Sequence, residues 1–107
     1  MPLAYESTIY CDRSQEVLIN IMQEAVERYL SSNPKVSVVE RNERVVVLKI
    51  PMSLKSWGEK LKIVVKKRSF LILSESSAFW QGHDWGKNAH NARTMCSYIN
   101  YIDLLSQ

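Results

Sequence analysis

The chain has 107 residues, of which 46% are apolar and 23% are charged, and its formal net charge is +3. A chain of this length and composition is expected to fold as one domain, residues 1–107, around a core that needs neither disulfide bonds nor metal. The modest charge allows an anionic partner, but it lacks the dense basic footprint of a dedicated nucleic-acid binder.

The two cysteines, Cys11 and Cys96, have no CxxC spacing and no His pair at ligand spacing, so zinc is not expected. No cofactor is indicated either. The N-terminus lacks a basic segment followed by an apolar run, and no apolar run approaches the roughly 18 residues of a membrane span. The two cysteines are expected to be small buried side chains without a disulfide bond, which favours a reducing compartment. Together these features predict a cytoplasmic protein.

The first elements are a strand over residues 5–11 and a helix over residues 13–31. The strand carries Tyr, Thr and Ile, which are typical of β-structure. Asp12 is expected to cap the helix, with Gln15 completing a capping box. The helix should end near Pro34, because proline cannot continue it. Its apolar stripe comprises Val17, Leu18, Ile21, Met22, Ala25, Val26 and Tyr29.

Two β-rich runs follow, over residues 36–41 and 44–50, and the short polar break between them predicts a hairpin. A two-residue turn at residues 42–43 sets which valines face each other. The expected pairs are Val39 with Val46 and Val38 with Val47. One of these two sets would then lie on the solvent side of the sheet, and the sequence leaves open which.

A second hairpin is predicted from residues 57–67 and 69–76, with Lys67-Arg68 as its turn. On the first strand, apolar and lysine residues alternate, which places them on opposite faces. The apolar set is Leu61, Ile63 and Val65. The expected cross-strand pairs are Val65 with Phe70, Ile63 with Ile72, and Lys60 with Glu75.

A final helix is predicted over residues 88–105. Its apolar stripe comprises Ala92, Met95, Cys96, Ile99, Ile102 and Leu105. The element order is therefore β-α-β-β-β-β-α, an α+β fold in which an antiparallel sheet carries two helices on one face. This order resembles the TATA-binding-protein-like and helix-grip folds in topology, a likeness that implies no function.

The helices can cover only one face of such a sheet. The predicted register leaves Val64, Leu71 and Leu73 on the other face, beside three lysines: Lys60, Lys62 and Lys66. An aliphatic patch rimmed by lysines predicts a contact surface. The alternative is an ordinary solvated sheet face, since much of any protein surface is apolar.

The segment over residues 74–91 crowds polar, aromatic and glycine residues between the last strand and the last helix. Entry into the helix explains most of them: Asp84 or Asn88 as cap, Gly86 as turn, and Trp85 with Trp80 as a staple. Three residues have no such explanation. They are Ser74, Ser76 and Gln81, and a site in this segment is expected where they meet.

This segment also holds residue types that are used in catalysis, metal binding and phosphate binding. His83, Asp84 and His90 near two serines suggest acid–base chemistry, but no GxSxG elbow and no HExxH spacing accompany them. Lys87 and two glycines at the helix start suggest an anion site, but no GxGxxG or P-loop is present. Hence no catalytic and no metal-binding residue is predicted, and His90 is expected on the exposed side of the helix.

The run Ser74-x-Ser76, then Gln81, then Asp84-x-Gly86-x-Asn88 and a closing helix resembles the end of a group of small bacterial and plastid domains of unknown function. The layout before it, a helix, a hairpin and a strand pair, is also similar. In that group an arginine commonly follows the second serine, where this chain has Ser77 and Ala78. The resemblance implies a fold and a site location, and it implies no activity.

Three functions follow from these features. The favoured one is a non-enzymatic interaction domain that self-associates, as a homodimer for example, or contacts a partner through the open sheet face. The second is an anion binder, for nucleic acid or lipid headgroups, through Lys60, Lys62, Lys66, Lys67 and Arg68. The third is a small-molecule site near Ser74, Ser76, Trp80, His83 and Asp84.

Overall fold

The computed structural model describes residues 4–51, 58–76 and 87–106. Within them the chain forms five strands and two helices in the predicted order. They are β1 (Ala4–Tyr10), α1 (Gln15–Ser32), β2 (Ser37–Arg41), β3 (Val45–Ile50), β4 (Glu59–Lys66), β5 (Ser69–Ser76) and α2 (Lys87–Leu105). The predicted α+β class is confirmed.

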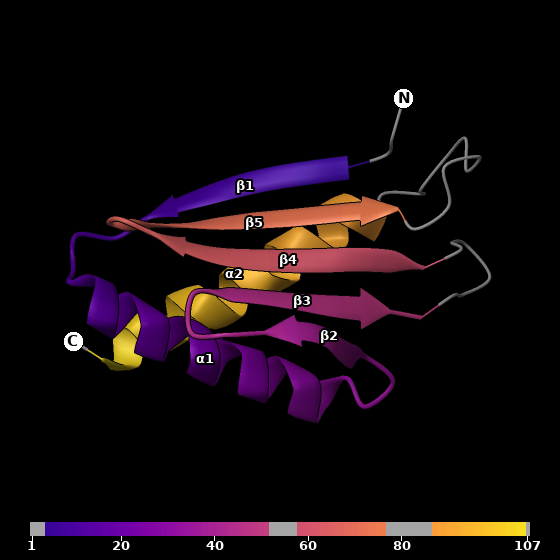
Figure 1. Cartoon of the computed structure of the whole chain (residues 1–107), viewed down its shortest axis with the longest axis horizontal. Coiled ribbons are helices and arrows are strands. Elements are labelled where there is room, and N and C mark those ends of the chain that lie inside the picture. Colours follow the sequence, from indigo (N-terminus) through magenta and orange to yellow (C-terminus); the bar gives the residue numbers. More distant parts are fainter. Residues whose placement is uncertain (1–3, 52–57, 77–86, 107) are drawn as a thin grey trace.

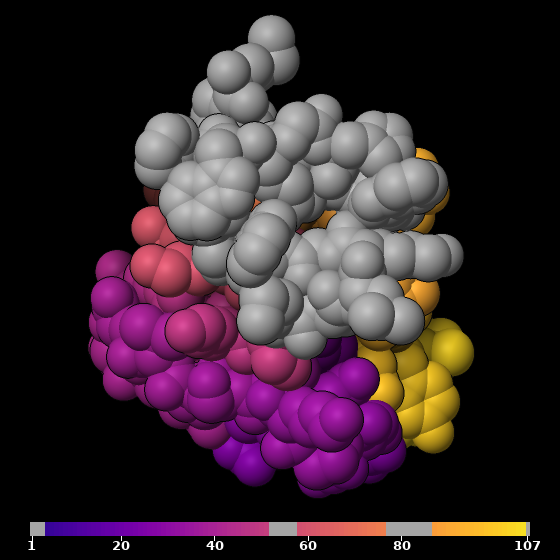
Figure 2. Space-filling view, turned by 90° about the vertical axis from the view of Figure 1, so that its right-hand side faces the viewer, coloured from indigo at the N-terminus to yellow at the C-terminus, as the bar shows by residue number. Residues whose placement is uncertain are grey.

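The strands form one antiparallel sheet in the order β1-β5-β4-β3-β2. The last four strands make the predicted meander, and β1 completes the sheet by pairing with β5. In Figure 1 helix α2 lies behind the strands and α1 lies along their lower side. The end-on view of Figure 2 separates the yellow atoms of α2 from the magenta and salmon atoms of the strands. The sheet therefore has one covered face, and none of the described elements covers the other.

The β4–β5 hairpin has the predicted register. Val65 pairs with Phe70, Ile63 with Ile72, and Lys60 with Glu75. Arg68 in the turn has a φ of 60°, the left-handed conformation that tight hairpin turns need between twisted strands. Its carbonyl oxygen accepts a hydrogen bond from the Cys11 N–H group at 3.0 Å. That bond ties the turn to the end of β1.

The β2–β3 hairpin departs from the predicted register, and neither valine pair forms. Arg41 pairs with Val46, Glu40 with Val47, and Val38 with Leu48, with an irregularity between Val38 and Glu40. Val46 is buried under the helices, whereas Val47 lies on the other face. The prediction of intact valine sets is wrong, because the bulge shifts the residues of β2 past those of β3.

The turn of this hairpin is longer than two residues, and the side chain of Asn42 holds it. The Asn42 N–H group donates to the Val45 carbonyl at 2.9 Å. The Asn42 side-chain oxygen accepts from the N–H groups of Arg44 at 3.0 Å and Val45 at 2.9 Å. Asparagine commonly bonds the backbone ahead of it in this way, and the turn it favours needs no glycine.

Replacing Asn42 with alanine is expected to lower the free energy of unfolding by about 1 kcal/mol, because two turn N–H groups lose their side-chain acceptor. Asn42→Asp keeps an acceptor oxygen at the same place and should cost clearly less. Urea unfolding of the two variants measures the difference. Equal losses would show that the side-chain oxygen does not hold the turn.

Helix α1 is capped by Ser14, whose hydroxyl accepts from the Val17 N–H group at 3.3 Å. The prediction of Asp12 is wrong, since the cap must directly precede the first helical residue. The Asp12 carboxylate instead lies 3.7 Å from the Arg68 guanidinium, and both side chains are exposed. At the other end, the Asn33 side-chain amide donates to the Tyr29 carbonyl at 2.8 Å.

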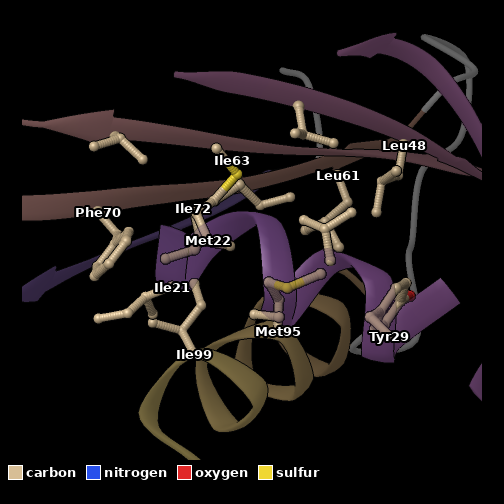
Figure 3. Packing of buried hydrophobic residues seen from close by; sticks show 14 of the residues in the cluster. Ile21, Met22, Tyr29, Leu48, Leu61, Ile63, Phe70, Ile72, Met95 and Ile99 are labelled. Carbon is tan, nitrogen blue, oxygen red and sulfur yellow. The ribbon is translucent and has the colours of Figure 1, made fainter. Parts of the chain in front are cut away.

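The core lies between the helices and the covered face of the sheet. Figure 3 shows Ile21 and Met22 of α1 and Met95 and Ile99 of α2 directed toward the strands. The strand side chains that meet them include Leu48, Leu61, Ile63, Phe70 and Ile72, each fully buried. Leu105, predicted in the α2 stripe, is 57% exposed because it ends the helix beyond Ile102, the last core residue. Neither described helix is long and apolar enough to cross a bilayer.

Candidate functional site

Six side chains that the sequence singles out share the sheet face opposite the helices. Along β4, burial alternates, so the residues between Leu61, Ile63 and Val65 point away from the core. The six are Lys60, Lys62, Val64 and Lys66 on β4 and Leu71 and Leu73 on β5. The three aliphatic side chains are half-buried and the three lysines exposed. We call this surface of strands β1 to β5 the open face.

A row of side chains, apolar except for Thr8 at one end, crosses the open face from β1 to β3, and we call it the apolar row. Val64 lies opposite Leu71, Leu71 opposite Thr8 of β1, and Val64 opposite Val45 of β3. Val47 adjoins the row on β3. Val45 was not predicted on this face, because the sequence left open which face of the first hairpin is buried; the pairing with Val64 decides it.

Charges of both signs flank the apolar row. Lys60 pairs with Glu75, and Lys62 lies opposite Leu73, whose other neighbour is Glu6. By strand register the charged side chains of this face are Lys49, Lys60, Lys62, Lys66, Glu6, Glu40 and Glu75. The lysines lie on β3 and β4, where Lys49 is directly opposite Lys60, and the carboxylates lie on β1, β2 and β5 to either side of them. The open face therefore carries both signs of charge.

A buried polar cluster joins β4, β5 and α2 at one end of the sheet. The Ser74 hydroxyl donates to the Asn88 side-chain oxygen at 2.8 Å, and the Asn88 amide donates to the Ser76 hydroxyl at 3.1 Å. The Asn91 amide donates to Glu59 Oε1 at 2.9 Å and to the Ser74 hydroxyl at 3.4 Å. Glu59, Ser74 and Asn88 are fully buried, and Asn91 is 4% exposed. Ser74 and Ser76 thus share Asn88 as a partner, and a site where they meet Gln81 stays a prediction.

The structure tests the predictions for some of the other residues of the segment over 74–91. Asn88 is not the cap suggested for it, because α2 begins at Lys87 and the Asn88 side chain bonds to β5. His90 is exposed, as expected. Trp80, Gln81, His83, Asp84, Trp85 and Gly86 lie outside the described residues.

Tyr29 of α1 lies close to the buried polar cluster. Burial, followed by Tyr98 and the Glu59 carboxylate, raises the pKa of Tyr29 to about 12. The rings of Tyr29 and Tyr98 meet edge to face, with centroids 5.7 Å apart. A phenol with so high a pKa stays protonated at neutral pH, so it supplies no base. The hydrogen bonds of the buried polar cluster join amide, hydroxyl and carboxyl groups of β4, β5 and α2 to one another, which suits a role in holding α2 on the sheet.

Glu59 is a buried charged residue of the candidate site that was not predicted from the sequence. A signal for it was present, since Glu59 continues the core-facing positions of Leu61, Ile63 and Val65 by one more alternate step. A carboxylate at a core position is rare unless other groups pair with it. Asn91 is one such group, and it is distant in sequence, so only the folded chain joins the two.

Two further features bear on ligand binding. Among residues 4–51, 58–76 and 87–106, no three His, Cys, Asp or Glu side chains are grouped so as to hold a metal ion.

A groove of about 570 Å³ runs between the helices. It is lined by Glu24, Glu27, Arg28, Ser31, Ser32, Tyr98 and Tyr101. The groove shares no residue with the open face or the buried polar cluster.

Comparison with models of known protein families gives no match, and neither does comparison with curated protein sequences. A crystal structure of a TBP-like protein from Parabacteroides distasonis superposes on this chain with a TM-score of 0.51 and 9% identity, covering 98% of this chain and 91% of that one. The fold is similar to that of this TBP-like protein. The likeness agrees with the topology predicted from the sequence.

The Zhui aromatase/cyclase from a Streptomyces species, R1128, superposes with a TM-score of 0.44 and 7% identity, covering 97% of this chain and 88% of that one. Function depends on sites that different sequences place on the same fold, so neither comparison assigns one to this chain. The resemblance to small bacterial and plastid domains stays a prediction.

Proposed function

We propose that this chain is a non-enzymatic binding module that contacts a protein partner through its open face. One observation carries the proposal: the apolar row of Thr8, Leu71, Val64 and Val45 crosses a face that no described element covers. Removing such a row from water is favourable in proportion to its area. Leu73 and Val47 widen the row toward one end of the sheet.

The charge pattern of the open face supports a protein partner over nucleic acid. A phosphate backbone rewards clustered lysines and is repelled by carboxylates. Here Glu75 stands opposite Lys60, and Glu6 flanks the strand beside Lys62. At the adjacent turn, Arg68 lies near Asp12. A surface with both signs of charge around an apolar centre instead suits a complementary protein surface.

The other elements of the proposal follow from the described side chains. The buried polar cluster supports a structural role over a small-molecule site, because its members bond to one another. Cys11 and Cys96 are free thiols. Burial and the Asp103 carboxylate raise the pKa of the Cys11 thiol, which disfavours the reactive thiolate form. Such thiols suit the cytoplasm.

The test places a charge in the apolar row. Leu71→Glu is expected to weaken partner binding by roughly tenfold or more, because the carboxylate would lose its water at the contact. Thr8→Glu should act in the same way and removes no half-buried contact, since Thr8 is exposed. Leu104→Glu is the matched control, because Leu104 is 66% exposed on α2.

Each variant is expressed in the native host at its natural level, and cross-linking followed by gel filtration gives the mass of the complex. Circular dichroism checks that each variant is folded. We expect a complex for wild type and Leu104→Glu, and free monomer for the two open-face variants. A wild type that runs as free monomer, both in extract and purified, would overturn the proposal.

A further inference from the structure

We propose that the partner of the open face is a second copy of this chain, packed face to face about a two-fold axis that runs along the strands between β4 and β5. This inference rests on the proposed function and names its partner. Closed two-fold dimers are the commonest soluble assemblies, and their interface must complement itself. The question is therefore whether the open face matches its own image.

An axis between β4 and β5 exchanges these two strands, so each residue of β4 faces the partner's residue at the paired position of β5. Leu71 then meets the partner's Val64, and apolar row packs on apolar row. Lys60 meets the partner's Glu75, and by symmetry Glu75 meets the partner's Lys60. Residues that are cross-strand neighbours within one sheet therefore become the residues that face each other between the two copies.

Lys62 extends the match. It faces the partner's Leu73, over which its aliphatic stem can pack. The partner's Glu6 is the next position across the sheet from Leu73, within reach of the ammonium group. The axis therefore joins two kinds of opposite-charge pair, each formed twice. Packed sheets cross at about 30°, so residues far from the crossing point move apart. A crossing point at Leu73 keeps the rows on either side of it, those of Glu75 and Leu71, facing the partner.

The other simple two-fold axis, across the strands, is disfavoured by the same residues. Such an axis sets β4 against β4 in reverse direction, so that the Lys60 end meets the partner's Lys66 end. Like charges would then face each other at both ends of the strand. Charge complementarity selects the axis along the strands.

The size of the face sets the expected strength. About this axis β3 faces the partner's β1 and β2 faces no strand, so four strands overlap. At about 4.8 Å between strands, with about seven residues each at roughly 3.4 Å per residue, the overlap is roughly 450 Å². Stable complexes bury about 800 Å² on each partner. The dimer is therefore expected to be reversible, with a dissociation constant in the micromolar range, and sensitive to salt because its charged pairs are at the rim.

A charge-complementation experiment on purified chains tests the arrangement. Lys60→Glu puts carboxylates opposite each other across the axis, and Glu75→Lys puts ammonium groups there. Each variant alone should dimerise roughly tenfold more weakly than wild type. In an equimolar mixture, the substituted position 60 of one chain meets the substituted position 75 of the other. Affinity should return to within about threefold of wild type.

Pairing within each chain cannot cause that rescue, because positions 60 and 75 of a single variant carry the same charge in the mixture as they do alone. Lys35→Glu, an exposed position outside the sheet, serves as the charge control, and thermal unfolding confirms that every variant folds. Sedimentation equilibrium measures the dissociation constants.

Rescue in the mixture supports the two-fold arrangement. A mixture no tighter than its components, or a wild type that stays monomeric at millimolar concentration, overturns it. In the second case the proposed function is tested separately. If wild type forms a complex in cell extract and Leu71→Glu does not, the open face binds a different protein. Only this inference then fails.

Discussion

Replacing Asn91 with alanine is expected to lower the free energy of unfolding by about 3 kcal/mol, a large part of the 5 to 15 kcal/mol typical of a domain. The Asn91 amide donates to the Glu59 carboxylate and to the Ser74 hydroxyl, all three nearly or fully buried. Without it, a carboxylate that folding removes from water loses one of its hydrogen bonds, and a cavity remains beside it.

Asn100 provides the matched control on the same helix. It is exposed, so Asn100→Ala should change the free energy of unfolding by no more than about 0.5 kcal/mol. Denaturant unfolding of both variants gives the comparison. A double-mutant cycle of Asn91→Ala with Glu59→Gln should show a coupling of about 1 kcal/mol. Additive losses would mean that the 2.9 Å contact contributes nothing to stability.

Raising the pH from below 10 to above 12 is expected to cost the fold about 3 kcal/mol through Tyr29 alone. Its pKa is about 12 in the folded chain against an ordinary value of 10.0, and each unit of difference corresponds to about 1.4 kcal/mol. Because the folded-state pKa is the higher one, this contribution is complete below pH 10. It is lost as the pH rises through 12.

Tyr29→Phe keeps the ring against Tyr98 and removes the hydroxyl that ionises. Its stability should therefore fall less steeply than that of wild type over the same alkaline range. Ultraviolet titration should show one late tyrosine fewer in this variant. Glu59→Gln should lower the pKa of Tyr29, because the Glu59 carboxylate contributes to the shift. Parallel alkaline curves for wild type and Tyr29→Phe would contradict the assignment.

The two hairpins show where sequence reasoning succeeds. The register of β4 and β5 was predicted correctly, because Leu61, Ile63 and Val65 recur at every second position of β4 and a two-residue turn leaves one register. The β2–β3 register was not, because β2 is exposed along its whole length and burial does not fix its register. There the Asn42 side chain and a bulge decided the pairing.

The candidate sites divide in the same way. Six of the residues on the open face were identified in advance, since period-two alternation assigns faces without knowledge of contacts. Ser74 and Ser76 were recognised as unexplained residues. The contacts of Asn91 with Ser74 and with the Glu59 carboxylate could not be assigned, because they span 17 and 32 residues of sequence.

The sequence by itself determined the element order, the α+β class, the apolar faces of both helices and the aliphatic patch that the helices leave uncovered. Local periodicity and turn chemistry carry that information, and both act over a few residues. Only the tertiary structure decided that β1 pairs with β5, that Val45 joins the apolar row, and that Glu59 meets Asn91 in the core. These outcomes depend on the packing of distant segments, where one helix position or one strand register is selected by the free energy of the whole core.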